Sequence, residues 1–281
     1  MATAAINGTT LYYDELGAGP TCLVLHGGLG LDHSLYRDFD RLATRVRLVY
    51  YDHRGNGRSG RPGLSTLTME QLADDAAVLL DHLDADRAII IGHSYGGFVA
   101  QELAVRHPDR VAALVLVDTT AGQRGAAEEP DGEQRPPMPA ELAAAMASAP
   151  PTDALMAAGM RPLLRHYLHR LSPDDVAPRS TPVRFDAAAM TRSMRVLADW
   201  SVADRLGAVT APALVLVGRH DVVTAPAEAR RIARRIPDAR VAEFDESGHF
   251  PWLEQPEEFF LVLETWLDHV HGLAVPRDLG R

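Results

Sequence analysis

The sequence predicts an α/β fold in which a mostly parallel central sheet is flanked by helices. Two features of the 281-residue chain support this prediction. Several short segments are nearly continuous in Val, Ile and Leu, a pattern typical of strands that are covered on both faces. Helical patterns lie between these segments, and a regular alternation of strand and helix indicates a three-layer architecture.

The expected elements run through most of the chain. Near the N-terminus, Asn7-Gly8 forms a tight turn between two apolar segments, which predicts a hairpin at one edge of the sheet. The expected strands of the parallel sheet are residues 21–26, 45–52, 87–94, 110–118, 212–218 and 239–244. The expected helices are residues 68–83, 97–107, 226–235 and 256–271.

Residues 119–205 interrupt this alternation because they contain no strand-like run. Ten of the nineteen prolines lie in residues 130–182, where they alternate with alanine-rich helical stretches. We therefore expect a helical lid over the carboxyl edge of the sheet, where α/β folds bind ligands. The core domain then comprises residues 1–118 and 206–281. The acidic, proline-rich residues 126–139 predict a mobile surface loop.

Six of the eight methionines lie in residues 138–194, within the expected lid. Methionine forms adaptable apolar surfaces, so this enrichment favours an apolar substrate. Packing of the lid helices on one another would explain the same methionines, and the sequence leaves both interpretations open.

The composition excludes several classes of partner. Lys and Arg number 28 and Asp and Glu number 38, which gives a formal net charge of −10. Such a surface repels the phosphates of nucleic acids and the anionic surface of membranes. No apolar run is long enough to span a bilayer. We therefore expect a small-molecule substrate as the partner, and the oligomeric state is left open.

The expected location is the cytoplasm. The first fifteen residues contain no basic segment followed by an apolar stretch, which is the pattern of a secretory signal. The single cysteine, Cys22, cannot form an internal disulfide, so a reducing compartment fits the sequence. Cys22 lies in an apolar run, and we expect it to be a small buried hydrophobic residue.

The strongest chemical signal is the segment Gly92-His93-Ser94-Tyr95-Gly96, which has the pattern G-x-S-x-G. It follows an expected strand and precedes a helical stretch. A sharp strand-to-helix turn at this point exposes the serine hydroxyl, and the two glycines leave room for the turn. The N-terminus of the following helix favours developing negative charge. We therefore interpret Ser94 as a catalytic nucleophile.

A serine nucleophile needs a histidine base that is held by an acid. In the strand-turn-helix serine enzymes the acid and then the histidine follow the serine along the chain. Asp221 and His249 each follow an expected strand, so both should lie at the sheet edge where Ser94 emerges. Asp118 also ends a strand and is the alternative acid, although we favour Asp221.

The third expected component is an oxyanion hole. Residues 26–30, His-Gly-Gly-Leu-Gly, follow the first parallel strand, and their glycines let the backbone approach a substrate carbonyl. We expect the two N–H donors to come from Gly28 and Tyr95.

Three other patterns are given structural interpretations. Residues 55–60 match G-x-G-x-x-G, but Arg-Pro-Gly follows them instead of a helix, which argues against a dinucleotide site. His166 and His169 have helical spacing but no further ligands nearby, so we predict no metal site. The basic residues 230–235 predict a solvated helix face.

The chain resembles the α/β-hydrolase superfamily, and most closely its proline iminopeptidase-like branch. The resemblance rests on five segments that occur in the order of the family: HGGLG, YDHRGNGRS, GHSYGG, GRHD and SGHFPWLEQP. It implies the α/β-hydrolase fold, a lid between the sixth and seventh strands, and no cofactor.

The sequence departs from that branch at the residues that recognise a free amine. Aminopeptidases of the branch carry one acidic residue directly after the catalytic aspartate and another before the tryptophan that ends the lid. Here Val222 takes the first place and Asp199 the second, and Leu29 replaces a proline. A valine cannot pair with an ammonium group. The expected substrate-binding residues are Leu29, Trp200, Val222 and Phe250.

The sequence therefore predicts a serine hydrolase that cleaves a carboxylic ester, thioester or lactone of a small apolar substrate through an acyl-enzyme on Ser94. One alternative is an aminopeptidase of the proline iminopeptidase type. Another is an acyltransferase, a lyase or a non-catalytic binding protein on the same fold, because one fold hosts many functions.

Overall fold

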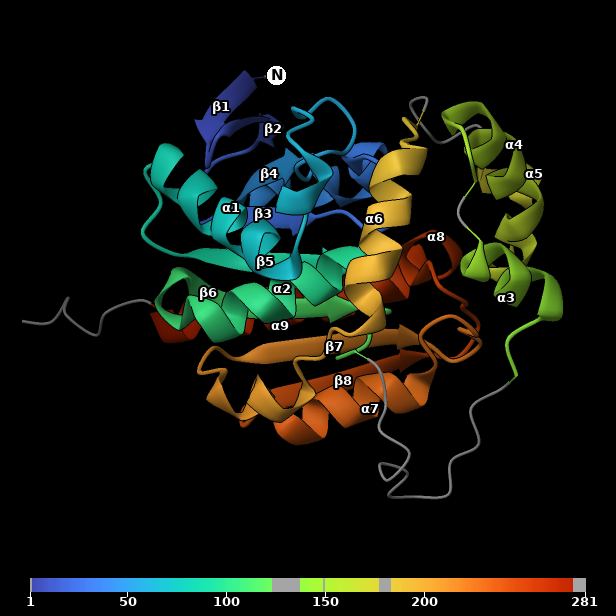
Figure 1. Cartoon of the computed structure of the whole chain (residues 1–281). Coiled ribbons are helices and arrows are strands. Elements are labelled where there is room, and N and C mark those ends of the chain that lie inside the picture. Colours follow the sequence, from blue (N-terminus) through green and yellow to red (C-terminus); the bar gives the residue numbers. More distant parts are fainter. Residues whose placement is uncertain (1, 123–136, 149, 177–182, 275–281) are drawn as a thin grey trace, which may run out of the picture.

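The central feature of the fold is an eight-stranded sheet with the strand order β1-β2-β4-β3-β5-β6-β7-β8 (Figure 1). The computed structural model describes residues 2–122, 137–148, 150–176 and 183–274. The strands are β1 (Ala2–Ile6), β2 (Thr9–Leu16), β3 (Thr21–Leu25), β4 (Arg47–Tyr51), β5 (Ala88–His93), β6 (Val111–Val117), β7 (Ala213–Gly218) and β8 (Ala239–Phe244).

The pairing of the strands confirms the predicted topology. Strands β3 to β8 pair in parallel, whereas β1 and β2 form an antiparallel hairpin at one edge. The turn of this hairpin holds Asn7 and Gly8 in the left-handed region, with φ of 45° and 74°. That conformation is one that Asn and Gly adopt more readily than other residues.

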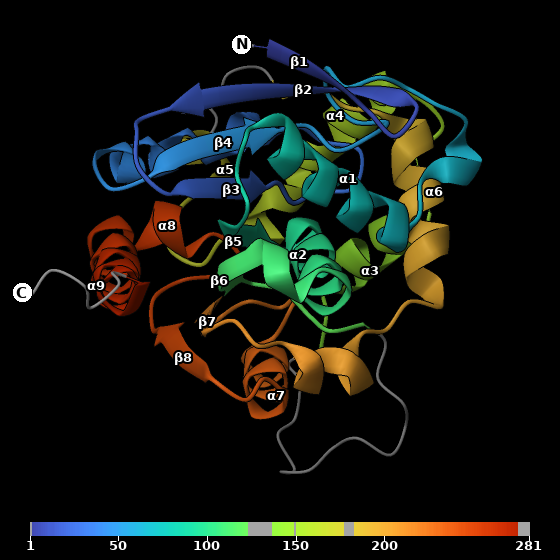
Figure 2. The same ribbon diagram turned by 90° about the vertical axis from the view of Figure 1, so that its left-hand side faces the viewer.

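Helices cover both faces of the sheet (Figure 2). Alternate strand residues pack into two separate cores, which explains why the strands are apolar without interruption. One core contains residues of α1 (Met69–His82), α2 (Tyr95–Arg106) and α7 (Pro226–Arg235). The other contains residues of η1 (His33–Thr44), α8 (Pro251–Glu254) and α9 (Pro256–Ala274). Cys22 is buried in β3, as predicted.

The helix η1 has no counterpart among the predicted elements. It is a 3₁₀ helix, and its buried aromatic and aliphatic residues Tyr36, Phe39 and Leu42 recur every three positions. A spacing of three matches the 3₁₀ repeat but not the α-helical pattern of three and four, so a search for amphipathic α-helices passes over it.

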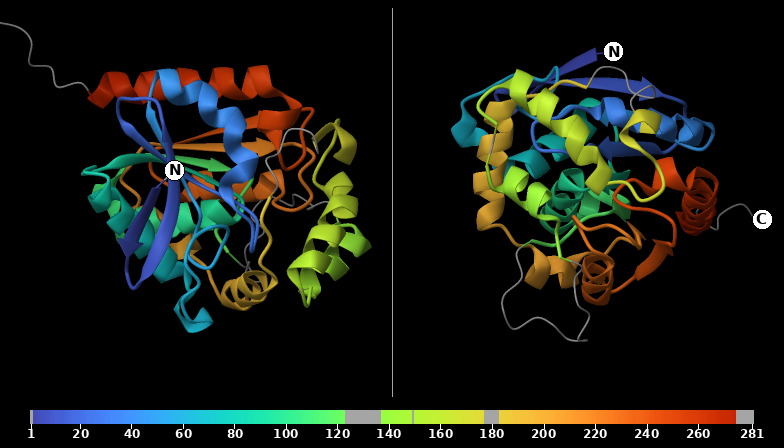
Figure 3. Two further views of the ribbon diagram at one scale, coloured as in Figure 1. Left: turned by 90° about the horizontal axis from the view of Figure 1, so that it is seen from above. Right: turned by 90° about the vertical axis from the view of Figure 1, so that its right-hand side faces the viewer.

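The segment between β6 and β7 contributes helices beyond the carboxyl ends of the strands. These are α3 (Ala140–Ala147), α4 (Asp153–Leu163), η4 (Leu164–His166), α5 (Pro173–Val176) and α6 (Ala187–Ala198). Figure 1 shows β7 and β8 pointing toward the side where α3, α4 and α5 lie, and in the right-hand view of Figure 3 these yellow-green helices cover the sheet. The predicted surface loop at residues 126–139 lies outside the described residues, apart from residues 137–139.

The remaining short helices connect the larger elements. They are η2 (Leu64–Thr66), η3 (Pro108–Arg110) and η6 (Ala203–Ala208). Within the described ranges, no helix combines the length and the apolar character needed to cross a membrane.

Candidate active site

Ser94 occupies a strained turn between β5 and α2. Its backbone has φ 50° and ψ −116°, a conformation that non-glycine residues rarely adopt. The neighbouring glycines are needed for steric reasons: a Cβ on Gly92 would meet the Gly96 carbonyl oxygen at 2.5 Å, and a Cβ on Gly96 would meet the Leu25 carbonyl oxygen at 2.0 Å. The turn therefore depends on glycine at both positions, which is the arrangement expected for an exposed nucleophile.

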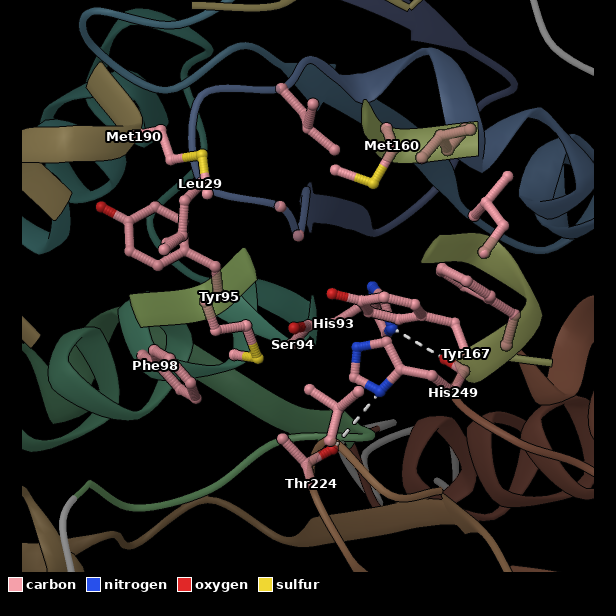
Figure 4. A pocket seen from close by; sticks show the side chains of 18 of the residues that line it. Leu29, His93, Ser94, Tyr95, Phe98, Met160, Tyr167, Met190, Thr224 and His249 are labelled. Carbon is pink, nitrogen blue, oxygen red and sulfur yellow. Dashed lines mark hydrogen bonds between the residues drawn. The ribbon is translucent and has the colours of Figure 1, made fainter. Parts of the chain in front are cut away.

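His249 and Asp221 meet in the loops that follow β8 and β7. The Nδ1 atom of His249 lies 2.8 Å from Oδ2 of Asp221. A carboxylate can only accept hydrogen bonds, so Nδ1 carries the hydrogen and Nε2 keeps its lone pair. Figure 4 shows the Nε2 side of the ring facing Ser94 across the pocket. The structure thus brings the three predicted catalytic residues to one place.

The carboxylate of Asp221 is held by further donors. Its Oδ1 accepts hydrogen bonds from the N–H groups of Val223 (2.7 Å) and Thr224 (3.1 Å), and its Oδ2 accepts one from the Thr224 hydroxyl at 2.5 Å. Burial raises the pKa of Asp221, but attraction to the protonated form of His249 and these hydrogen bonds outweigh burial and hold the pKa well below its ordinary value. Asp221 is therefore ionised.

Asp118, the alternative acid, lies beside the same pair but in a different protonation state. A carboxyl oxygen of Asp118 lies within 4.8 Å of a carboxylate oxygen of Asp221 and of a ring nitrogen of His249. Burial, and then the negative charge of Asp221, raise the pKa of Asp118 well above its ordinary value. Three such groups could in principle share a metal ion, but the hydrogen bonds of Asp221 and His249 already occupy the facing atoms. The arrangement fits a hydrogen-bonded acid and base rather than a metal centre.

The two predicted oxyanion donors come from the loop after β3 and from the first residue of α2. Gly28, in the loop after β3, has φ +79°, and a Cβ there would meet the Leu31 side chain at 2.2 Å. Tyr95 is the first residue of α2, so its N–H has no acceptor within the helix. Both residues line the same pocket as Ser94. Their role as donors stays a prediction, and their positions are compatible with it.

The glycine-rich residues 55–60 form a tight turn against the end of β4 and the start of η1. Gly57 packs so tightly that a Cβ would meet Asp52 Oδ2 at 2.2 Å. Asp52 accepts hydrogen bonds from His33 Nδ1 at 2.6 Å and from the Arg58 N–H at 2.7 Å. Because Asp52 holds η1 and the glycine-rich turn together, the segment has a structural function and does not open a helix toward a nucleotide.

The pocket above Ser94 has a volume of about 830 Å³ and is largely apolar (Figure 4). Of the predicted substrate-binding residues, Leu29, Trp200 and Phe250 line it, whereas Val222 does not. Val223 lines the pocket instead, in the turn where its N–H donates to Asp221 Oδ1. The five methionines that line the pocket are Met138, Met146, Met160, Met190 and Met194.

A family model described as the alpha/beta hydrolase fold matches residues 20–256 of this chain. The chain belongs to the alpha/beta hydrolase family. This result confirms the superfamily that the sequence resembles, whereas the proline iminopeptidase-like branch stays a prediction.

Three known proteins illustrate what this alpha/beta hydrolase is similar to. A protein of Caulobacter sp. (strain K31) that is named for carbamate hydrolysis is 28% identical, over 91% of this chain and 95% of its own. The pimeloyl-[acyl-carrier protein] methyl ester esterase of Chromobacterium violaceum is 28% identical, over 92% and 98%. The enol-lactonase structure from Burkholderia xenovorans LB400 has a TM-score of 0.78 at 27% identity, over 95% and 100%.

Among the described residues, one carboxylate lines the pocket of this hydrolase, and it is already paired. Glu228 of α7 accepts hydrogen bonds from the Thr120 hydroxyl at 2.8 Å and from the Arg231 guanidinium at 3.2 Å. Arg231 is buried, so the prediction of a solvated face for residues 230–235 is wrong at this position. Asp199, in contrast, is exposed and does not line the pocket.

Several residues near the site escaped the sequence analysis. Tyr36 lines the pocket from η1 and Tyr167 from the segment that follows η4.

His166 and His169 do not converge on a shared ligand: His166 pairs with Glu141, and His169 stacks on His220 with ring centroids 3.5 Å apart. The sequence offers no local signal for such contacts, because each depends on how distant segments pack.

Proposed function

We propose that this alpha/beta hydrolase cleaves a carboxylic ester, thioester or lactone of an apolar substrate through an acyl-enzyme on Ser94. One observation carries the proposal: the imidazole of His249 is held through Nδ1 by an ionised Asp221 and presents Nε2 to Ser94 inside an apolar pocket. An imidazole fixed in this tautomer is a general base for a hydroxyl.

The proposed reaction has two stages. In the first, Ser94 Oγ attacks the substrate carbonyl carbon while His249 Nε2 takes the hydroxyl proton, and His249 then gives that proton to the departing alkoxide or thiolate. In the second, a water molecule gives a proton to Nε2 and attacks the acyl carbon. The carboxylic acid leaves, and the proton returns from Nε2 to Ser94 Oγ.

The charge that develops during each attack needs stabilisation by the backbone. We assign this role to the N–H groups of Gly28 and Tyr95, which line the same pocket as Ser94. The N-terminus of α2 adds a favourable dipole at the same point. Asp221 stabilises the imidazolium that forms on His249 in both stages.

The pocket favours a neutral substrate over one with a free amine. The position after Asp221, where the resemblance implies an acidic residue, holds Val222, which does not line the pocket, and Asp199 is exposed. The charge of Glu228 is balanced by Arg231. Among the described residues, an ammonium group would therefore lose its hydration without gaining a free carboxylate, at a cost of several kcal/mol. The similarity to an ester hydrolase and an enol-lactonase supports the same preference.

We also propose that residues 119–205 form a lid and that the natural substrate enters beneath it. Residues of α4 and α6, among them Met160 and Met190, line the pocket from the side opposite Ser94 (Figure 4). Methionines adapt their shape to a ligand, so this wall suits apolar groups of varied form.

The test compares hydrolysis of a panel of p-nitrophenyl esters, thioesters, lactones, carbamates and proline p-nitroanilide by the wild type, Ser94→Ala and His249→Ala. We expect the esters or lactones to be preferred and both variants to lose about 10³-fold or more in kcat while remaining folded. Ser65→Ala, an exposed serine outside the pocket, is the control. Faster turnover of the anilide, or near wild-type turnover by Ser94→Ala, would refute the proposal.

A further inference from the structure

We propose that Tyr36 and His93 are positioning residues that tie the oxyanion loop to the main chain of His249. The inference rests on the proposed function, because it concerns the relative placement of the oxyanion donors and the general base. Neither residue is given a role in the reaction proposed above.

A continuous chain of hydrogen bonds joins the two parts of the site. The N–H of Gly27, next to the predicted donor Gly28, lies 2.6 Å from the hydroxyl of Tyr36. That hydroxyl lies 2.7 Å from Nδ1 of His93, and Nε2 of His93 lies 3.0 Å from the carbonyl oxygen of His249. Figure 4 shows the last of these contacts as a dashed line. The chain thus connects η1, β5 and the loop after β8.

The chemistry of the four groups allows a single direction for every hydrogen. The carbonyl of His249 can only accept, so His93 donates from Nε2 and keeps a lone pair on Nδ1. Tyr36 therefore donates its hydroxyl hydrogen to Nδ1, and its oxygen accepts the hydrogen from Gly27. Burial, and then repulsion from His249 when that ring is protonated, hold the pKa of His93 well below its ordinary value, so His93 is neutral and the link keeps one arrangement.

Packing leaves the link little freedom to adjust. Tyr36 and His93 are both buried, at 1% and 3% exposure. The His93 ring contacts the Trp252 ring with centroids 4.6 Å apart. A Cβ on Gly27 would meet His93 Nδ1 at 2.7 Å and the Tyr36 hydroxyl at 2.9 Å. The close approach of the loop to the link thus requires glycine at position 27.

The position of His93 next to Ser94 explains why the link should affect catalysis. His93 directly precedes Ser94, so one residue is bonded to the nucleophile and reaches the oxyanion loop and the general base. A displacement of about 1 Å between reacting groups can reduce turnover by about 100-fold. Loss of the Tyr36 hydroxyl should therefore affect the chemical step more than substrate binding, because the ring of Tyr36 stays in the pocket wall.

The experiment uses Tyr36→Phe, which removes one hydroxyl and keeps the ring. Tyr51→Phe is the matched control, because among the described residues no hydrogen-bond partner faces the buried Tyr51 hydroxyl, and Tyr51 does not line the pocket. Both variants are assayed on the best p-nitrophenyl ester of the wild type. Functional sites are counted by titration with an organophosphate that modifies Ser94, so that kcat refers to folded enzyme.

We expect Tyr36→Phe to lose about 10- to 100-fold in kcat per titrated site with KM changed by less than about threefold, and Tyr51→Phe to match the wild type. A trifluoromethyl ketone, which forms a tetrahedral adduct with a serine, should lose affinity for Tyr36→Phe by a similar factor. In a double-mutant cycle with His93→Gln, which keeps a side-chain donor, the two losses should not add.

The outcomes separate this inference from the proposed function. Wild-type kcat per titrated site in Tyr36→Phe, or an equal loss in Tyr51→Phe, would overturn the positioning role and leave the proposed function intact. A loss explained entirely by fewer titrated sites would also overturn it, since that pattern indicates a role in folding alone. A wild type without Ser94-dependent turnover would overturn both.

Discussion

Asp118 and Asp221 place two buried carboxyl groups beside the same imidazole ring, and only one of them is ionised. Asp118, at the end of β6 with φ 42°, accepts a hydrogen bond from the Gly218 N–H at 2.9 Å. Its second oxygen meets no donor among the described residues, which suits a protonated carboxyl whose own O–H donates toward Asp221. Two carboxylates this close and this buried cannot both stay ionised, so one of them keeps a proton. That proton resides on Asp118, because fewer hydrogen-bond donors stabilise its charged form.

The first prediction separates the roles of the two carboxyls. Asp118→Asn should keep kcat/KM within about fivefold of the wild type, because the amide, like the protonated carboxyl, is neutral and can donate to Asp221. Asp221→Asn should lose about 10³- to 10⁴-fold, because an amide neither fixes the Nδ1–H tautomer nor stabilises the imidazolium. Steady-state rates on one ester measure both effects.

A second prediction concerns Asp118 when Asp221 is replaced. The negative charge of Asp221 helps to raise the pKa of Asp118, so Asp221→Asn should allow Asp118 to ionise at lower pH and to support His249 in part. The double variant Asp118→Asn/Asp221→Asn should then be slower than Asp221→Asn by about tenfold or more, with the gap widening as pH rises. Equal rates for the single and double variants across the pH range would show that Asp118 cannot substitute.

The same pair makes a prediction about stability. The folded-state pKa of Asp118 lies above its unfolded value of about 4, so between these values the native state binds the extra proton and unfolding becomes easier as pH rises. Asp118→Asn removes this titration. The difference in Tm, variant minus wild type, should therefore increase from about pH 4 toward pH 7. Thermal unfolding at several pH values measures it, and a difference that falls with pH would contradict the assignment.

The fold could be predicted, and so could the convergence of the three proposed catalytic residues, because their signals are local. The strands are covered on both faces and are therefore apolar throughout, and Ser94, Asp221 and His249 each follow a strand end. The helix after Ser94 begins at Tyr95 rather than at the expected position 97, because the strained turn leads into the helix directly.

The parts that escaped prediction depend on contacts between distant segments. Arg231 is buried because Glu228 pairs with it beneath the pocket, which no basic run by itself reveals. Val223 rather than Val222 lines the pocket because the backbone turns around a carboxylate. Tyr36 reaches the site only because η1 packs against the loop after β3.

A fourth prediction concerns Trp200, which anchors one wall of the pocket. Its indole N–H donates to Glu102 at 3.0 Å, and Glu102 is also bound by the Arg205 guanidinium. Trp200→Phe should raise KM several-fold and reduce the free energy of unfolding by about 1 kcal/mol, because the donor is lost while Arg205 keeps Glu102 paired. Trp266→Phe, in α9 outside the pocket, should leave KM unchanged. An equal rise in KM in that variant would show that the effect of Trp200→Phe does not come from the pocket wall.

The fifth prediction concerns Glu254, whose carboxylate binds two segments that meet at His249. Its Oε1 accepts the N–H groups of three consecutive residues, 169–171, at 2.6 to 3.1 Å, and its Oε2 accepts that of Gly248 at 2.6 Å. The His249 N–H in turn donates to the Tyr167 carbonyl at 2.7 Å. One buried carboxylate therefore fixes the segment after η4 to the loop that carries the proposed base.

Glu254→Gln should reduce the free energy of unfolding by about 2 to 3 kcal/mol, because an amide accepts through one atom only and its NH₂ group faces a donor. Trypsin should then cleave after Arg170 faster than in the wild type, since residues 169–171 lose their common acceptor. Glu257→Gln, at an exposed position one turn along, should change stability by less than about 0.5 kcal/mol. Urea unfolding and mass analysis of the first tryptic fragments distinguish these outcomes. Equal stability and equal cleavage in the two variants would contradict the prediction, because they would show that hydrogen bonds to water replace those to Glu254 at no cost.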